Sequence, residues 1–517
     1  MKKAVIKLMS LLAVMAVCRC PAAETFYAKP ESVAIKSPVD RALEAQWKAN
    51  GLLPVAEASD FLLVRRLYLD LAGRLPSVEE AKSFVYSREP DKYELLVDKL
   101  LASADFVNCF GMYFSDMLRV KSEFPINLWP NAVYIYQRRI EKFLAENEPY
   151  TDFVRALLLA KGSNFRIAEA NFYRAHADRS PMGIARNTLL TFCGVRLEKM
   201  NKDFQDGFAR IFEEIGFKST KEWKEEIVYI KSCPERMIVL PSGRKVKVAP
   251  GREARLLLAD YLTRDKDGRL SLANALVNRT WYWFFGSGIV PEADDLSGGK
   301  PVNEALLKVL TGEVIAGNFN FRKLCRTIVC SAAYRSASFQ GKDTARKLKH
   351  FAAYPIRRLG AEVLDDVITD LSQSPGKYSS VIPEPFTFLP GYMRTVQIAD
   401  GSISSSFLIL FGRPSRDAGT LAERNDTINA KQRLFLFNSG SLYQRICRIL
   451  RRKEYQRLSF MAKVDMLYWM FYSRPASRAE RALIQANFNA RPSKKRWMVQ
   501  NDIAWIMVNS AEFLYRH

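Results

Sequence analysis

The sequence predicts a mainly α-helical protein in which two helical domains are joined by a small insert that contains a β-hairpin. Helix N-cap signatures recur along the chain, apolar residues repeat with helical spacing, and strand patterns are few. Three capping boxes, each with a glutamate three residues after a serine, predict helix starts at Ser77–Glu80, Ser219–Glu222 and Ser477–Glu480. No internal repeat is apparent in the sequence.

The first 23 residues have the layout of a secretory signal peptide. A basic start, Met1-Lys2-Lys3, precedes an apolar run from Ile6 to Val17, and small residues surround a predicted cleavage site after Ala22 or Ala23. This run is shorter than the roughly 20 residues that span a bilayer. Cys18 leaves a lipid-anchored alternative open. The sequence therefore predicts export to the periplasm, the cell envelope or the exterior, with no transmembrane segment after signal removal.

An N-terminal helical domain is predicted over residues 40–205. Its clearest helix follows Asp91, because Tyr93, Val97 and Leu100 fall on one helical face.

The insert is predicted over residues 206–249. Two strand-like runs, 237–240 and 245–248, are separated by Pro241-Ser242-Gly243, which is typical of a short exposed hairpin. Pro250-Gly251 then predicts a hinge.

A C-terminal helical domain is predicted over residues 250–517. The segment from Leu272 to Phe285 is apolar nearly all round and stops at Gly286, which predicts a buried central helix. The stretch 372–405, rich in Ser, Pro and Gly, predicts a long loop.

The chain is strongly basic. Its 78 Lys and Arg against 55 Asp and Glu give a net charge of +23 over 517 residues. The signal segment 1–22 holds four basic and no acidic side chains, so the mature chain keeps +19. Such a charge favours association with anionic surfaces. Because the basic residues are scattered and carry no nucleic-acid-binding motif, we expect no nucleic-acid partner.

Cysteine and histidine usage restricts the chemistry further. Six cysteines follow the signal segment, each among apolar neighbours, which favours buried free thiols over disulfides and leaves any pairing pattern open. The three histidines, His176, His350 and His517, are far apart in sequence. We therefore predict neither a metal site nor a histidine-based catalytic triad.

Acidic and arginine side chains of the C-terminal domain are the candidates for a ligand site. Paired carboxylates can bind Ca²⁺ or divide acid and base roles, and they also cap helices. Arginine suits bidentate capture of carboxylate, phosphate or sulfate. The alternative use of the same residues is an internal ion-pair lattice that ties loops to helices, for example through Arg358 and Glu362, four residues apart. The candidates are Asn278, Arg279, Asp294, Asp295, Arg357, Arg358, Glu362, Arg413, Arg416, Glu423 and Arg424.

Several short segments follow one another in a specific order. They are 66–77, 258–260, 277–281, 285–295, 355–364, 411–414 and 509–514. In this order they resemble two paired domains of unknown function, families 1549 and 1553, found in secreted proteins of Planctomycetes, Verrucomicrobia and their relatives. The resemblance implies a helical scaffold and covers nearly the whole mature chain, but it implies no settled activity.

One departure from the family concerns haem. Many relatives look like c-type haem carriers with Cys-x-x-Cys-His directly after a Gly-Val-Arg-Leu element. Here Gly194-Val195-Arg196-Leu197 is present, but Lys199 and Lys202 stand at the two thiol positions and Asp203 at the histidine position. Covalent attachment requires those thiols, so we expect no c-type haem and no other cofactor.

Three functional hypotheses follow. The first is an exported, non-redox binding or structural module for an anionic partner such as polysaccharide or another envelope component. The second is a glycan-active hydrolase or lyase that uses Asp294 or Asp295, Glu362 and Glu423. The third is a degenerate electron-transfer protein.

Overall fold

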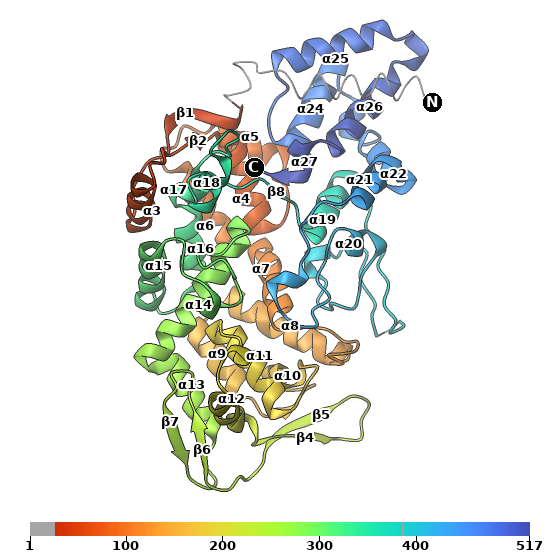
Figure 1. Cartoon of the computed structure of the whole chain (residues 1–517). Coiled ribbons are helices and arrows are strands. Elements are labelled where there is room, and N and C mark those ends of the chain that lie inside the picture. The colour runs from red at the N-terminus through yellow and green to blue at the C-terminus, as the bar shows by residue number, and fades with distance from the viewer. Residues whose placement is uncertain (1–25, 385) are drawn as a thin grey trace.

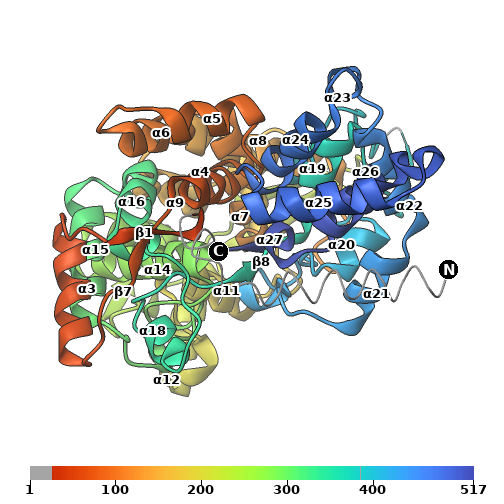
Figure 2. The same ribbon diagram turned by 90° about the horizontal axis from the view of Figure 1, so that it is seen from above.

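The computed structural model describes residues 26–384 and 386–517, and within these ranges the protein is mainly α-helical, as the sequence predicts (Figure 1). The predicted signal peptide, residues 1–23, lies outside the described residues. No described helix is both long and apolar enough to cross a lipid bilayer. Seen from above, the C-terminal helices gather on one side of the molecule, and α3 (Pro38–Ala49), α15 (Glu304–Ala316) and α16 (Phe321–Val329) lie on the other (Figure 2).

Short helices follow one another along the whole chain. In the first half they are α3 (Pro38–Ala49), α4 (Asp60–Leu67), a π-helical turn η1 (Tyr68–Ala72), α5 (Val78–Tyr86), α6 (Lys92–Leu101), α7 (Ala104–Met117), α8 (Pro130–Ala145), α9 (Tyr150–Leu159), α10 (Asn171–Arg174), α11 (Pro181–Cys193) and α12 (Lys202–Ala209). In the second half they are α13 (Ala254–Arg264), α14 (Lys266–Phe285), α15 (Glu304–Ala316), α16 (Phe321–Val329), α17 (Ala332–Arg335), α18 (Thr344–Lys349), α19 (Ala361–Ser372), α20 (Ser406–Leu410), α21 (Ala430–Asn438), α22 (Gly440–Ile449), α23 (Lys453–Gln456), α24 (Phe460–Tyr472), α25 (Arg478–Ala490), α26 (Trp497–Val508) and α27 (Ala511–Leu514).

The strands form small antiparallel sheets. β1 (Ala28–Ser32) pairs with β2 (Ala56–Ala58), and β8 (Arg357–Arg358) pairs with β9 (Tyr515–Arg516) near the C-terminus. β5 (Glu226–Ile230) lies between β3 (Gly162–Ser163) and β4 (Ile215–Ser219). The hairpin predicted in the insert is present as β6 (Arg236–Val239) and β7 (Lys245–Val248), with Met237 opposite Lys247.

One predicted helix start is wrong. Ser219 is the last residue of β4 and does not cap a helix, because the segment that follows it turns back into β5. Glu225 holds this turn, accepting a hydrogen bond from the Thr220 hydroxyl at 3.1 Å. The β4–β5 pair is not predicted by the sequence. The capping boxes at Ser77 and Ser477 are both present.

The buried central helix predicted at residues 272–285 is α14. It begins six residues earlier than predicted, where the Asp265 side chain caps it, and it ends at Gly286 with φ of 71°. Two observations favour glycine at this position. Its φ is left-handed, and a Cβ there would lie 2.6 Å from Cδ of Arg357. Gly286 therefore lets Arg357 lie close against the end of the central helix.

Hydrophobic side chains form two buried clusters. The first is built mainly from residues 33–354, with Ala399 and Trp469 packed into it, and combines the N-terminal helices, the insert and α13–α17. The second is built mainly from residues 359–514, with Leu69 and Met112 packed into it. These two packing units are offset from the sequence-based domain limits, 40–205 and 250–517, which stay a prediction.

All six cysteines of the described residues are unpaired. Cys109, Cys193 and Cys325 are buried, and the other three are half-buried. Burial raises the pKa of both Cys109 and Cys193 to about 12. The preference for free thiols predicted from their apolar neighbours agrees with this arrangement.

Candidate functional site

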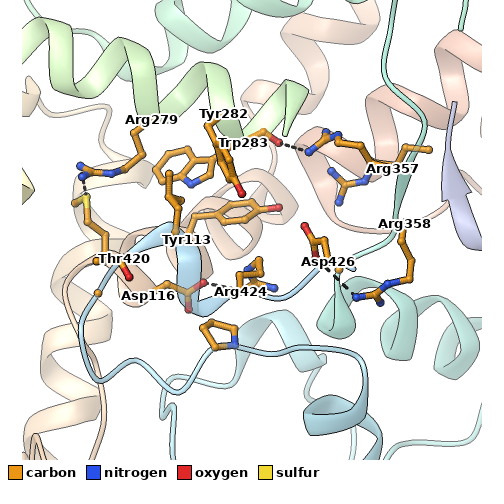
Figure 3. Close-up of a pocket in the computed structure, with 16 residues that line it drawn as sticks. Tyr113, Asp116, Arg279, Tyr282, Trp283, Arg357, Arg358, Thr420, Arg424 and Asp426 are labelled. Carbon is orange, nitrogen blue, oxygen red and sulfur yellow. Dashed lines mark hydrogen bonds and ion pairs between the residues drawn. The ribbon is translucent and has the colours of Figure 1, made fainter. Parts of the chain in front are cut away.

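A cavity lies where five parts of the chain meet (Figure 3). Its walls come from α7, from the C-terminal end of α14, from β8, from β9, and from the loop that carries Pro414 to Asp426. The volume is about 40 Å³, which is room for a few water molecules. Five arginines line it: Arg279, Arg357, Arg358, Arg424 and Arg516.

Arg424 is the most strongly paired of the five. Its Nη1 lies 2.6 Å from Oε2 of Glu362, and its Nη2 lies 2.7 Å from Oδ2 of Asp116. Arg416 reaches the other oxygen of Asp116 at 2.8 Å, and Arg413 lies 3.5 Å from Glu362. Burial opposes ionisation of Glu362, but the Arg424 and Arg413 guanidinium groups hold the pKa of Glu362 at about 2.

Arg357 is the most weakly neutralised. Its nearest carboxylate, Asp70, is 4.0 Å away, and Asp70 is already paired with Arg516 at 2.6 Å. Arg357 donates instead to the backbone carbonyls of Trp283 and Phe284 at the end of α14. The Nε of Arg357 is buried and has no hydrogen-bond partner among the described residues.

Arg279 and Arg358 complete the set. Arg279 lies 3.2 Å from Asp294 and donates to the carbonyl of Thr191. Arg358 lies 3.9 Å from Asp426 and donates mainly to backbone carbonyls.

Positive charge exceeds negative charge around this cavity. The seven arginines named above share five carboxylates: Asp70, Asp116, Asp294, Glu362 and Asp426. The excess positive charge lies in partly desolvated surroundings, because the Arg357 side chain is only 16% exposed. Charges there are screened less by solvent than at an open surface. The cavity is therefore electrostatically suited to an anion.

Aromatic side chains form the remaining wall. The rings of Tyr113 and Trp283 are stacked, with centroids 5.2 Å apart and planes at 21°. Tyr282 lines the cavity beside them (Figure 3). Burial raises the pKa of Tyr113 and of Tyr282, so both phenols stay neutral hydrogen-bond donors. The Nε1 of Trp283 is buried without a partner among the described residues.

Four of the residues predicted from sequence converge on this cavity: Arg279, Arg357, Arg358 and Arg424. Asp294 pairs with Arg279 and Glu362 with Arg424. Arg413 and Arg416 lie behind them and pair with Glu362 and Asp116.

The other predicted residues have structural roles. Asn278 bridges the backbone of Val290 and Ala293 from within α14. Asp295 is fully buried, 2.6 Å from Lys199. Glu423 accepts backbone N–H groups of Asp417, Ala418, Gly419 and Thr420, and so shapes the loop over the cavity. The internal ion-pair lattice, considered above as the alternative, thus accounts for most of the acidic candidates.

The carboxylates named in the hydrolase or lyase hypothesis all have structural partners. Glu362 is held by two arginines, Asp294 by Arg279, and Asp295 by Lys199. Glu423 is engaged by the backbone of its own loop.

Sequence reasoning missed several lining or pairing residues. Tyr113, Asp116, Asp70 and Arg516 come from segments far from the predicted arginines. The others had a local signal: Tyr282 and Trp283 lie on α14 close to Arg279, and Asp426 follows Arg424 by two residues. Tyr113, Asp116 and Arg516 are brought in by packing alone.

The residues at the haem-motif positions do not fit a covalently attached haem. Lys199 pairs with Asp295, and Lys202 pairs with Asp206 at 2.8 Å on α12. Neither position supplies a thiol, and Asp203 supplies no imidazole. In the described ranges no group of three or more His, Cys, Asp or Glu side chains is arranged to hold a metal ion.

Two family models match the chain. Residues 38–199 match the family model described as a protein of unknown function (DUF1549), and residues 254–488 match the one described as a protein of unknown function (DUF1553). The chain carries this pair of domains. The DUF1549 segment supplies Tyr113 and Asp116 to the cavity, and the DUF1553 segment supplies four of its five arginines. No curated protein and no solved structure matches the chain.

Proposed function

We propose that this DUF1549–DUF1553 protein is an exported, non-redox component of the cell envelope that binds an anionic group of a polysaccharide in its arginine-lined cavity. The observation that carries the proposal is the unequal charge around the cavity, where seven arginines share five carboxylates. Arg357 is the residue left without a close carboxylate partner of its own.

The size of the cavity decides which part of a ligand enters. One water needs roughly 10–15 Å³ of such space, so about 40 Å³ accepts a carboxylate, sulfate or phosphate group but no sugar ring. We infer that the anionic substituent enters while the body of the glycan stays outside. Arg357, whose Nε has no partner among the described residues, offers a planar donor group to the anion, and the neutral phenols of Tyr113 and Tyr282 add hydroxyl donors.

Export and the absence of covalent haem belong to the same proposal. The signal-like segment 1–23 supports export, with cleavage after Ala22 or Ala23. Sequencing the N-terminus of protein recovered from the envelope fraction tests this. An uncleaved chain recovered from the cell interior would contradict it.

Binding is tested with short galacturonate and sulfated galactan oligomers, measured by titration calorimetry against the wild type, Arg357→Met and Arg264→Met. The control Arg264 carries the same charge on α13 but is 68% exposed and outside the cavity. Loss of a charged hydrogen-bonding group costs about 1.5–3 kcal/mol, so Arg357→Met weakens binding about ten- to hundredfold. Arg264→Met leaves it within about twofold. Equal effects of the two variants would refute a specific site.

A further inference from the structure

A second hollow, about 730 Å³ in volume, opens on the surface where the start of α8 meets the turn between β4 and β5. It shares no lining residue with the arginine cavity. Four aromatic and four polar side chains line it: Trp129, Phe165, Trp223, Phe386, Asn131, Arg166, Glu222 and Glu225.

The aromatic rings form an exposed corner. Trp223 is 69% exposed, and its ring meets Trp129 edge-on, with centroids 5.9 Å apart and planes at 78°. Phe386 meets Trp129 from another side at 5.5 Å. A tryptophan with this exposure lacks much of the hydrophobic burial that usually stabilises so large a side chain. The corner thus keeps aromatic area available for a molecule outside the chain.

The backbone that presents Trp129 is held in an unfavourable conformation. Trp129 has φ of 72°, and Asn127 and Arg119 in the same loop have φ of 62° and 57°. Left-handed φ in a bulky residue is rare and costs of order 1 kcal/mol or more. The loop is fixed by a hydrogen bond from Leu128 N–H to the Lys121 carbonyl at 3.2 Å. Strain of this kind collects where a side chain must be presented in one fixed position.

The polar groups at the rim are of two kinds. Glu225 is already oriented by the hydroxyls of Ser163 and Thr220. Arg166 and Asn131 add donors to the same rim. The hollow therefore combines an oriented acceptor with donors.

We propose that this aromatic corner binds neutral hexopyranose units of a polysaccharide. A pyranose ring offers an apolar C–H face, which suits Trp223 and Trp129, and a hydroxyl edge, which needs both donors and acceptors, as Arg166 and Glu225 provide. The proposal is independent of the arginine cavity, because the charge excess there plays no part in it.

Affinity electrophoresis through gels containing soluble glucan, mannan or galactan tests this with full-length protein. The variants are Trp223→Ala and Trp497→Ala, whose tryptophans are similarly exposed, at 69% and 61%, with Trp497 on α26. We expect at least one neutral glycan to retard the wild type, with Trp223→Ala weakening the interaction at least tenfold. Trp497→Ala leaves it unchanged, and Trp223→Phe retains part of it.

Three results would overturn the inference: no retardation by any glycan of the panel, equal losses in the two alanine variants, or sedimentation showing a wild-type dimer that Trp223→Ala dissociates. The last result would assign the corner to a second copy of this chain. Arg357→Met separates this test from the one for the cavity. It is expected to weaken galacturonate binding and to leave retardation by neutral glycan unchanged.

Discussion

Arg74 and Arg474 lie in two helix-to-helix turns that are far apart in the sequence, and they make matching sets of hydrogen bonds there. Each guanidinium donates through Nη1 and Nη2 to a glutamate six residues later, Glu80 or Glu480, at 2.8–3.0 Å. Each also donates through Nη1 to the carbonyl of the residue that follows it. The Nε of each reaches one more carboxylate, Asp105 at 2.8 Å and Glu512 at 2.6 Å.

The surroundings of the two arginines match as well. The residue before each, Gly73 and Ser473, is left-handed, with φ of 62° and 59°. Ser77 and Ser477 then form the two capping boxes. The sequence shows no repeat, because few of the residues at equivalent positions are identical. The structure nevertheless repeats one helical corner near both ends of the chain.

Removing these arginines tests how much the corners stabilise the fold. Arg474 is 5% exposed, and Arg474→Met leaves Glu480 and Glu512 facing each other without a cation, a loss of about 3–5 kcal/mol. Arg74 is 25% exposed, so Arg74→Met costs less. Arg264→Met, on a surface pair, costs about 0.5 kcal/mol or less. Urea unfolding measures all three, and a loss for Arg474→Met no larger than for Arg264→Met would contradict the account.

Glu362 makes the stability depend on pH in a defined direction. Its pKa is about 2 in the folded protein, against 4.5 for the free side chain, so the unfolded chain binds more protons in acid. The stabilisation is complete above about pH 4.5 and is lost as the pH falls toward 2. We expect Glu362→Gln to be less stable at neutral pH and to have a flatter profile below pH 5. Parallel profiles for the variant and the wild type would contradict this.

The cysteines are expected to remain thiols even without a reductant. Cys109, Cys193 and Cys325 are buried, and burial raises the pKa of each, so little reactive thiolate forms. We expect Ellman's reagent to modify only the half-buried cysteines in the folded protein and to count six thiols after unfolding. Fewer than six without reductant would reveal a disulfide.

Haem attachment provides an independent check. Since Lys199, Lys202 and Asp203 occupy the motif positions, expression with a c-type haem attachment system should give colourless protein. The measurement is the absorption spectrum after denaturation and removal of free haem. A retained, covalently bound haem band would contradict the non-redox assignment.

Local patterns predicted local structure well. The apolar run ending at Gly286 predicts α14, and Pro241-Ser242-Gly243 predicts the β6–β7 turn, because both depend on nearby residues. The β4–β5 hairpin was missed because Ser219 and Glu222 imitate a helix cap.

Only part of the candidate site could be predicted from the sequence, and the reason differs from the one for the β4–β5 hairpin. Arginine-rich segments identified four lining residues, but the excess charge depends on which carboxylates fold against them. Asp70 and Arg516 lie at opposite ends of the chain and meet at 2.6 Å only after β8 and β9 pair. Tyr113 and Trp283 stack from α7 and α14. Such pairs are set by tertiary packing, which one sequence does not encode in any local pattern.

The most direct measurement of the central claim is the dissociation constant of one galacturonate oligomer for the wild type, Asp116→Asn and Arg357→Met. Asp116 neutralises Arg416 and Arg424, so Asp116→Asn adds one net positive charge beside the cavity, whereas Arg357→Met removes one. Asp98→Asn, on an exposed pair with Arg326, controls for net charge. The account predicts binding tighter than wild type for Asp116→Asn, weaker for Arg357→Met, and unchanged for Asp98→Asn. Identical constants for all four proteins would contradict it.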